Sequence, residues 1–166
     1  MLQSIFNIDG LMVIIRRDHA FTPARGFGSV ERLERRTGRP LPQDMLRFYT
    51  EFDGARLFVN EYVLLDPDGI LPFDTVIRAV HEGGPRVPDT WLSFCRTRDG
   101  HWVAFDLAPA AGGEHPVAVF GHVGADQAPL LQVVAPSFAC FLAMALVSRR
   151  HPYWLDINHP HGARSS

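Results

Sequence analysis

The order in which helical and strand-like patterns follow one another constrains this chain more than any single motif. Two helical patterns come first, at residues 29–38 and 42–54, and strand-like segments with turn signals occupy most of residues 56–135. Residues 137–148 then carry apolar side chains three and four positions apart, the spacing of an amphipathic helix. Helices segregated from strands predict an α+β fold: a mostly antiparallel or mixed sheet of about six strands, with helices packed mainly on one side.

Single residues predict where the helices begin and end. Ser29 is placed to cap the first helix and Gly38 to end it. Pro42 suits the first position of the second helix, and Gly54 its end. Before them, the apolar run at residues 11–15 predicts a strand. We therefore expect the chain to begin with a strand and to enter its first helix at residue 29.

Turn-forming residues divide the strand-like region into hairpins. Asn60-Glu61 and Asp99-Gly100 each stand between two strand patterns, and Asp-Gly is favoured in tight hairpin turns. Asp74 is placed to cap a short helix between the hairpins. The expected extended segments are residues 56–59, 62–65, 70–73, 91–96, 101–107, 117–122 and 130–135.

Length and composition indicate one soluble domain. The chain has 166 residues, of which 46% are hydrophobic, and this suits a single folded core. No apolar run reaches the ~18 residues of a membrane span. No basic segment or cleavage site accompanies the apolar stretch near the N-terminus, so we expect no signal peptide and a cytoplasmic location. We expect one domain over residues 1–148 and a polar tail over residues 149–166, anchored by Tyr153 and Trp154.

The charges are unevenly distributed along the chain. All 16 basic residues are arginine, and the formal net charge is −2. Residues 1–60 and 149–166 are each mildly basic, whereas residues 61–148 hold 4 arginines and 10 acidic residues. This asymmetry predicts a polarised surface, and such a surface steers binding partners more than it shapes a fold.

An ordered series of short motifs runs from residue 29 to residue 147. It consists of Val30–Glu34, Thr37–Pro42, Phe48-Tyr49, Phe52–Gly54, Trp91–Phe94, Asp99-Gly100, Phe105–Leu107, Pro116-Val117, Ala135–Phe138 and Phe141-Leu142. The series resembles the SUKH superfamily, which contains fungal cell-wall-synthesis regulators and many bacterial immunity proteins. Asp53 is a mild departure, since the family usually has an Asn-Gly pair there. The motif residues suit core and turn positions, so the resemblance implies a binding module without a catalytic set.

Three functions remain open at this point. The resemblance to bacterial members implies a cytoplasmic immunity protein that binds and neutralises a cognate toxin. The resemblance to fungal members implies a regulatory or scaffolding adaptor. An enzyme with an active site assembled from dispersed residues is the third, because spatial proximity is not visible in sequence. We expect a protein partner, no nucleic-acid or membrane partner, and no cofactor.

Acidic side chains in turns are the predicted partner-binding residues. Many toxins opposed by the family are nucleases, by resemblance, and nuclease active sites are positive because they hold phosphates. An acidic inhibitor surface gains fast association from that complementarity. The sequence therefore predicts partner contacts from Asp66, Asp68, Glu82 and Asp89. The alternative surface is a basic stripe along the first helix, made of Arg32, Arg35, Arg36 and Arg39.

Three further motifs resemble metal or nucleotide sites only in part. The Gly26-Phe27-Gly28 segment lacks the third glycine of a phosphate-binding loop. The turn at residues 66–69 resembles the opening of a calcium loop, but the later ligands are missing. His151, Asp156, His159 and His161 could share a metal, yet proline-separated histidines in a polar tail are more often solvated. We therefore expect no metal site.

Overall fold

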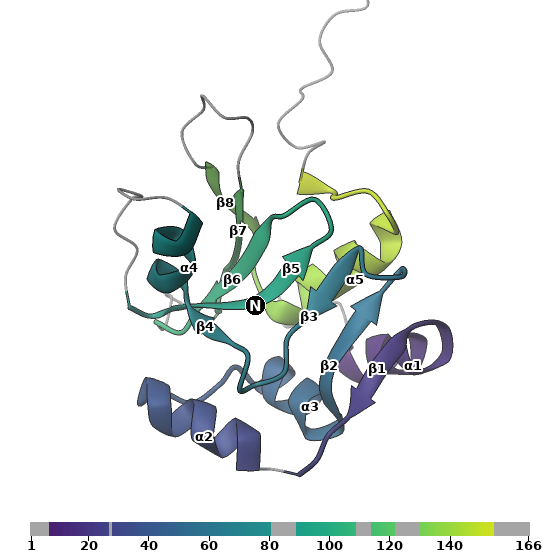
Figure 1. The fold of residues 1–166 in the computed structure, drawn as a ribbon. Coiled ribbons are helices and arrows are strands. Elements are labelled where there is room, and N and C mark those ends of the chain that lie inside the picture. The colour runs from purple at the N-terminus through teal and green to yellow at the C-terminus, as the bar shows by residue number, and fades with distance from the viewer. Residues whose placement is uncertain (1–6, 27, 81–88, 109–113, 122–129, 155–166) are drawn as a thin grey trace, which may run out of the picture.

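The centre of the fold is an eight-stranded sheet (Figure 1). The computed structural model describes residues 7–26, 28–80, 89–108, 114–121 and 130–154. Neighbouring strands follow the order β1-β2-β3-β5-β6-β7-β8, and β4 pairs with β5 off this path. Every pairing is antiparallel. The predicted α+β class is confirmed, with eight strands in place of about six.

The strands and helices have the following bounds. The strands are β1 Ala20–Pro23, β2 Phe52–Leu57, β3 Tyr62–Leu64, β4 Leu71–Pro72, β5 Trp91–Thr97, β6 Trp102–Asp106, β7 Val117–Gly121 and β8 Leu130–Ala135. The helices are α1 Ile8–Asp18, α2 Gly28–Thr37, α3 Gln43–Glu51, α4 Phe73–Val80 and α5 Phe138–Ser148.

The two faces of the sheet carry unequal cores. Side chains alternate between the faces along a strand. Val103 and Phe105 belong to the larger buried cluster, together with residues of α1, α2, α3 and α5. Ala104 lies between them in sequence and joins a smaller cluster with Phe73 and Ile77 of α4. Helices therefore pack mainly on one side, as predicted, and α4 covers part of the other.

The closing helix packs as its sequence pattern predicts. Phe138 and Phe141 of α5 are 1% and 0% exposed, and their rings lie 5.4 Å and 5.5 Å from the ring of Phe94 in β5. The chain then returns to the core, because Tyr153 and Trp154 are 6% and 1% exposed. This aromatic cluster joins the last helix to the centre of the sheet.

The prediction of a strand at residues 11–15 is wrong, because this run lies inside α1. Leu11, Met12 and Ile15 point to one side and are buried, whereas Val13 is 56% exposed. The side chain of Asn7 accepts the Asp9 N–H (3.0 Å) and caps the helix. The buried residues are separated by one, three and four positions, and this spacing is typical of a helix. The strand was predicted from the apolar character of the run alone.

Gly54 does not end a helix as predicted; it lies within β2. Helix α3 ends at Glu51, and the chain passes directly into the strand. Gly54 has a φ of +119°, and a Cβ there would lie 2.5 Å from the carbonyl oxygen of Leu64. The glycine is required by the close approach of two strands in an unusual backbone conformation.

Helix starts differ from the predictions at three places. Asp74 does not cap α4 from outside, because this helix already begins at Phe73. α2 begins at Gly28, so Ser29 lies inside the helix, where its hydroxyl accepts a hydrogen bond from Arg32. Pro42 is the residue before α3. The predicted cap of α5 is confirmed, since the Ser137 hydroxyl accepts the Cys140 N–H (3.2 Å).

The start of α5 is also capped from a distant helix. Asp44 of α3 accepts the N–H of Ala139 in α5 (2.7 Å) and that of Met45 (2.9 Å). One carboxylate thus satisfies backbone donors at the starts of both helices, where negative charge is favoured by the helix dipoles.

Candidate functional site

The predicted acidic residues lie in two separate turns. Asp66 and Asp68 share the turn between β3 and β4, where Asp66 accepts the Gly69 N–H (2.7 Å). Asp89 is exposed in the turn before β5. Glu82 falls outside the described residues. That these acids contact a partner stays a prediction.

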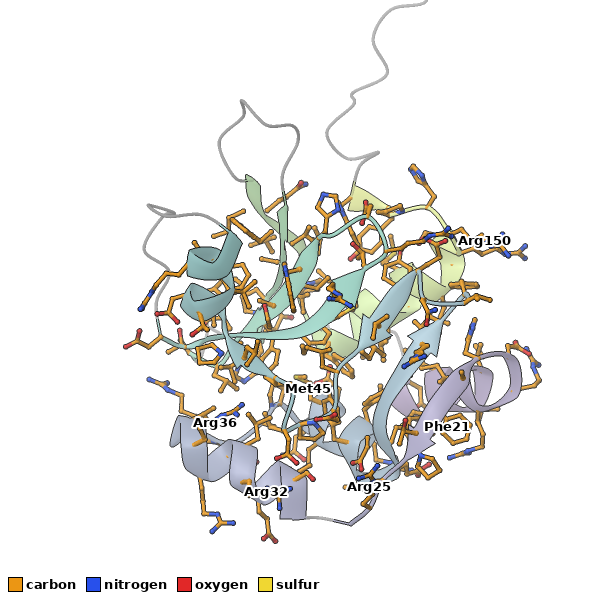
Figure 2. The ribbon with its side chains drawn as sticks, viewed as in Figure 1. Phe21, Arg25, Arg32, Arg36, Met45 and Arg150 are labelled. Carbon is orange, nitrogen blue, oxygen red and sulfur yellow. The ribbon has the colours of Figure 1, made fainter. Side chains whose placement is uncertain are left out.

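The basic stripe on α2 is largely engaged within the chain. Arg32 forms an ion pair with Asp68 (2.8 Å), and hydrogen bonding to this guanidinium lowers the pKa of the carboxyl. Arg36 donates to the carbonyl of Ile70, and Arg35 donates to the carbonyl of Glu31. Figure 2 shows Arg32 and Arg36 together on α2, far from Arg150 across the view. Arg32 and Arg36 therefore hold α2 to its surroundings, whereas the Arg35 bond lies within α2 itself.

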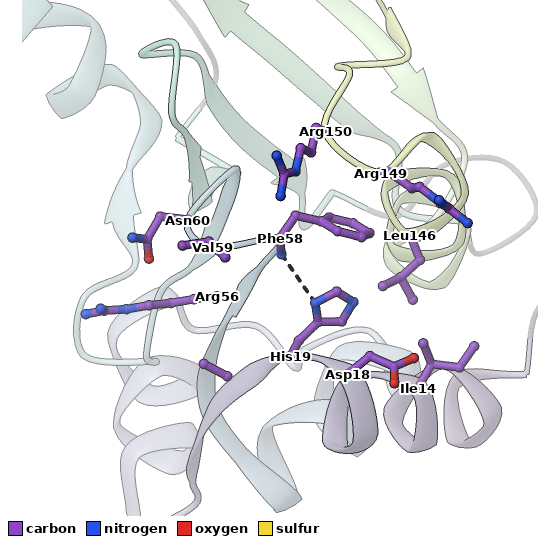
Figure 3. Close-up of a pocket in the computed structure, with 11 residues that line it drawn as sticks. Ile14, Asp18, His19, Arg56, Phe58, Val59, Asn60, Leu146, Arg149 and Arg150 are labelled. Atoms are coloured by element: carbon purple, nitrogen blue, oxygen red, sulfur yellow. Dashed lines mark hydrogen bonds between the residues drawn. The ribbon is translucent and has the colours of Figure 1, made fainter.

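A depression of about 1080 Å³ opens at the tip of the β2–β3 hairpin. It lies between the hairpin, the end of α1 and the end of α5 (Figure 3). Three segments far apart in the sequence supply its walls: residues 14–20, 56–60 and 146–150. We call this feature the hairpin-tip depression.

The backbone around the hairpin-tip depression is unusual. Phe58, Val59 and Asn60 are consecutive residues with φ values of +50°, +57° and +74°. Arg149, across the depression, has a φ of +58°. Among the described residues, these four are the only non-glycine residues with positive φ, and all four line this depression. Left-handed conformations cost about 1–2 kcal/mol per residue, so strained backbone is concentrated here.

Contacts from both sides hold the hairpin tip in this conformation. The N–H of Phe58 donates to Nδ1 of His19 (3.3 Å), and the two rings meet edge to face at 4.5 Å. On the other side, the Arg98 N–H donates to the carbonyl of Glu61 (3.1 Å), and their side chains form an ion pair (3.2 Å). Burial lowers the pKa of His19, although Asp18 opposes the shift. The neutral imidazole is therefore the form that accepts the Phe58 N–H.

The hairpin-tip depression is positively charged. Arg56, Arg149 and Arg150 are exposed, and none forms an ion pair with another described residue. Asp18 is the one acid lining this part of the structure, and it is paired with Arg17 (2.6 Å). The three guanidinium groups are thus free to bind an anionic group from outside the chain.

The lining residues are mainly basic and apolar. The described residues of the depression include no serine, threonine or cysteine that could serve as a nucleophile. In the part of the chain that the structure describes, no group of three or more His, Cys, Asp or Glu side chains could hold a metal ion. The described lining therefore forms a basic, partly apolar concavity.

No local sequence pattern predicted this depression. Its walls come together only in the folded chain. Arg149 and Arg150 directly follow the helix predicted at residues 137–148, where basic side chains suit the helix dipole without any further role. The turn was predicted at Asn60-Glu61, but β2 ends at Leu57 and the turn already begins at Phe58. Phe58 and Val59 are bulky apolar residues where glycine or asparagine is usual, so no turn signal marked them.

Comparison with known proteins identifies a family for most of the chain. A model described as the SMI1 / KNR4 family (SUKH-1) matches residues 28–144. No curated protein matches the sequence. Among the helices that the structure describes, none has both the length and the hydropathy required to cross a membrane. The matched region includes the β2–β3 hairpin but excludes α1, β1 and the arginines that follow α5.

Proposed function

The chain belongs to the SMI1/KNR4 family (SUKH-1), and from that membership we propose a non-catalytic immunity protein that neutralises a cognate bacterial toxin by direct binding. The proposed partner is a protein, and the proposed site of action is the cytoplasm.

The family match over residues 28–144 is the observation that carries this proposal. The motif residues that suggested the family are largely structural. Five of them are at most 3% exposed: Leu33, Leu41, Phe48, Phe94 and Phe138. A pattern that maps onto buried positions defines a scaffold, so function is expected on the surface that this scaffold presents.

Co-expression with a candidate toxin tests the proposal. The probe is the product of the gene next to the one encoding this chain. We expect growth to be restored, and a catalytically inactive form of the toxin to form a stoichiometric complex with the chain during gel filtration. Protection should require at least one copy of the chain per toxin. Protection at far lower ratios would indicate an enzyme, and no protection by the folded chain would overturn the proposal.

A regulatory adaptor is the second candidate, favoured by the SMI1 and KNR4 proteins after which the family is named. An adaptor would bind a protein of its own cell and would give no protection against a neighbouring gene's product. The co-expression experiment therefore separates the two functions.

A further inference from the structure

We propose that the hairpin-tip depression is the partner-binding surface, and that it holds an acidic protein segment with an apolar residue among its carboxylates. This inference rests on the proposed function only in taking the partner to be a protein.

The first argument is the cost of the turn conformation. Val59 is β-branched, has a φ of +57° and is 80% exposed. Its side chain gains almost no burial within the chain, while glycine at this position would relieve the strain. An exposed apolar residue kept in a strained conformation is explained by a contact outside the chain.

The second argument is the distribution of charge. Arg56 stands on the hairpin, and Arg149 and Arg150 stand on the opposite wall (Figure 3). Figure 3 shows the Arg56 and Arg149 side chains directed to opposite sides, so separate carboxylates of one acidic segment would pair with the two walls. Bidentate arginine–carboxylate pairing is strong and directional. Elsewhere, acids of this chain already neutralise arginines, as in the Arg32–Asp68 pair.

The third argument favours a protein segment over a nucleic acid. Ile14, Phe58, Val59 and Leu146 contribute apolar surface to the lining, which suits an apolar side chain of the partner. A continuous phosphate backbone would present charge but no apolar side chain to this lining.

The surface continues from the depression along one row of the sheet. Arg56 is the register partner of Val63, Val63 of Arg96, and Arg96 of Trp102. The Arg96 guanidinium lies 5.8 Å from the centre of a Trp102 ring. Arginine and tryptophan are enriched at the energetic centres of protein interfaces, so a longer partner segment has a path to follow.

The family match divides the depression into two parts. The hairpin lies within the matched residues, whereas α1, β1 and the Arg149–Arg150 pair lie outside them. The site thus combines an element inside the family match with elements outside it. A toxin held through an acidic segment would be bound away from a phosphate-binding active site, because such active sites are positive.

A peptide of the required chemistry tests the site without knowledge of the partner. The probe is acetyl-Asp-Glu-Leu-Asp-Glu-amide, and the control is its Asn/Gln counterpart. In NMR titrations at about 50 mM salt, where screening is weak, the acidic peptide should shift the backbone amides of Arg56, Val59 and Arg149. The neutral peptide should leave them unchanged.

Two charge-matched variants complete the test. R149E/R150E should weaken peptide binding by about tenfold or more. R35E/R39E changes the net charge equally at the far end of α2, and should leave affinity unchanged. Equal losses in both variants, or shifts centred on α2, would overturn the proposal. Tighter binding of a single-stranded oligonucleotide at the same amides would also overturn it.

The outcome is separable from that of the proposed function. Peptide binding at the hairpin tip without protection against the neighbouring toxin would overturn the proposed immunity function and would support the proposed binding site. Protection that survives R149E/R150E but is lost in D66R/D89R would overturn the proposal for this site. It would support the acidic surface predicted from sequence.

Discussion

Arg32 and Asp68 are joined by two parallel hydrogen bonds, from Nε to Oδ1 (3.1 Å) and from Nη2 to Oδ2 (2.8 Å). The pair links α2 to the turn between β3 and β4. It therefore connects the basic stripe with the acidic turn, the two surfaces that were predicted from sequence as alternative interfaces. A substitution that reverses the charge of Asp68 would therefore remove an anionic group and at the same time release Arg32 from its ion pair.

This pair predicts the titration of Asp68. Hydrogen bonding to Arg32 lowers the pKa of the carboxyl below the ordinary value of about 3.9. In an NMR titration, the Asp68 midpoint should lie below that value and should rise when Arg32 is changed to glutamine. Arg35→Gln, one turn away in sequence, should not move it. An unshifted midpoint in the wild type would show that the pair does not persist in solution.

Val59→Gly is expected to stabilise the protein by up to ~1 kcal/mol. Relief of a left-handed conformation, worth about 1–2 kcal/mol, exceeds the entropic cost of glycine, about 0.5–1 kcal/mol. Val133→Gly is the matched control, because Val133 is 59% exposed but lies in β8 without a positive φ. It should destabilise. Urea unfolding of each variant measures the change in the free energy of unfolding relative to the wild type. Destabilisation by V59G would show that Val59 is not strained.

Gly54→Ala should cost more than about 2 kcal/mol, since the new Cβ meets the Leu64 carbonyl at 2.5 Å in a backbone conformation that alanine avoids. Gly10→Ala is the opposite case: Gly10 lies in α1 with nothing within 4 Å of a Cβ, so alanine should stabilise by up to ~1 kcal/mol. Denaturant unfolding of the two variants measures the contrast. Equal effects would show that β2 and β3 do not approach as described.

Phe141→Ala should destabilise by about 3–5 kcal/mol, because the side chain is fully buried among the rings of Phe94, Tyr62 and Trp154. Val147→Ala on the same helix should change stability by less than about 0.5 kcal/mol, since Val147 is 78% exposed. A loss below about 1 kcal/mol for F141A would count against the packing of α5.

The hairpin tip should weaken as the pH falls. The folded state lowers the pKa of His19, so the unfolded chain takes up the proton first, near pH 6.5. The stability that depends on neutral His19 is therefore complete above about pH 6.5 and is lost below it. His19→Asn keeps an acceptor for Phe58 but cannot titrate. The fall in stability between about pH 7.5 and 5.5 should be larger in the wild type. Equal falls would exclude His19 as the cause.

Local patterns account for what the sequence predicted well. The helix from Phe138 and the turn at Asp99-Gly100 depend on spacings within a few residues, and both are confirmed. The strand predicted at residues 11–15 failed because apolar character was weighed above helical spacing. The prediction that Gly54 ends a helix failed because glycine is needed there for the close approach of a neighbouring strand, and no local pattern shows that approach.

The hairpin-tip depression lay beyond sequence reasoning for a geometric reason. His19 and Phe58 are 39 positions apart, and Arg149 is farther still along the chain. The two arginines after α5 were visible in the sequence, but only the folded chain places them opposite Arg56. The predicted acidic residues were chosen for their charge and their place in turns, and the sequence could not show that Asp68 already has a partner.

The Asp44–Ala139 hydrogen bond has a consequence for synthesis on the ribosome. Its partners are 95 positions apart, so the bond forms only after nearly all of the described fold has been made. Until α5 emerges, the sheet face that carries Phe94 lacks the rings of Phe138 and Phe141. Cooperative folding of this domain therefore waits for α5, and until then the nascent chain presents an apolar surface of the kind that chaperones recognise.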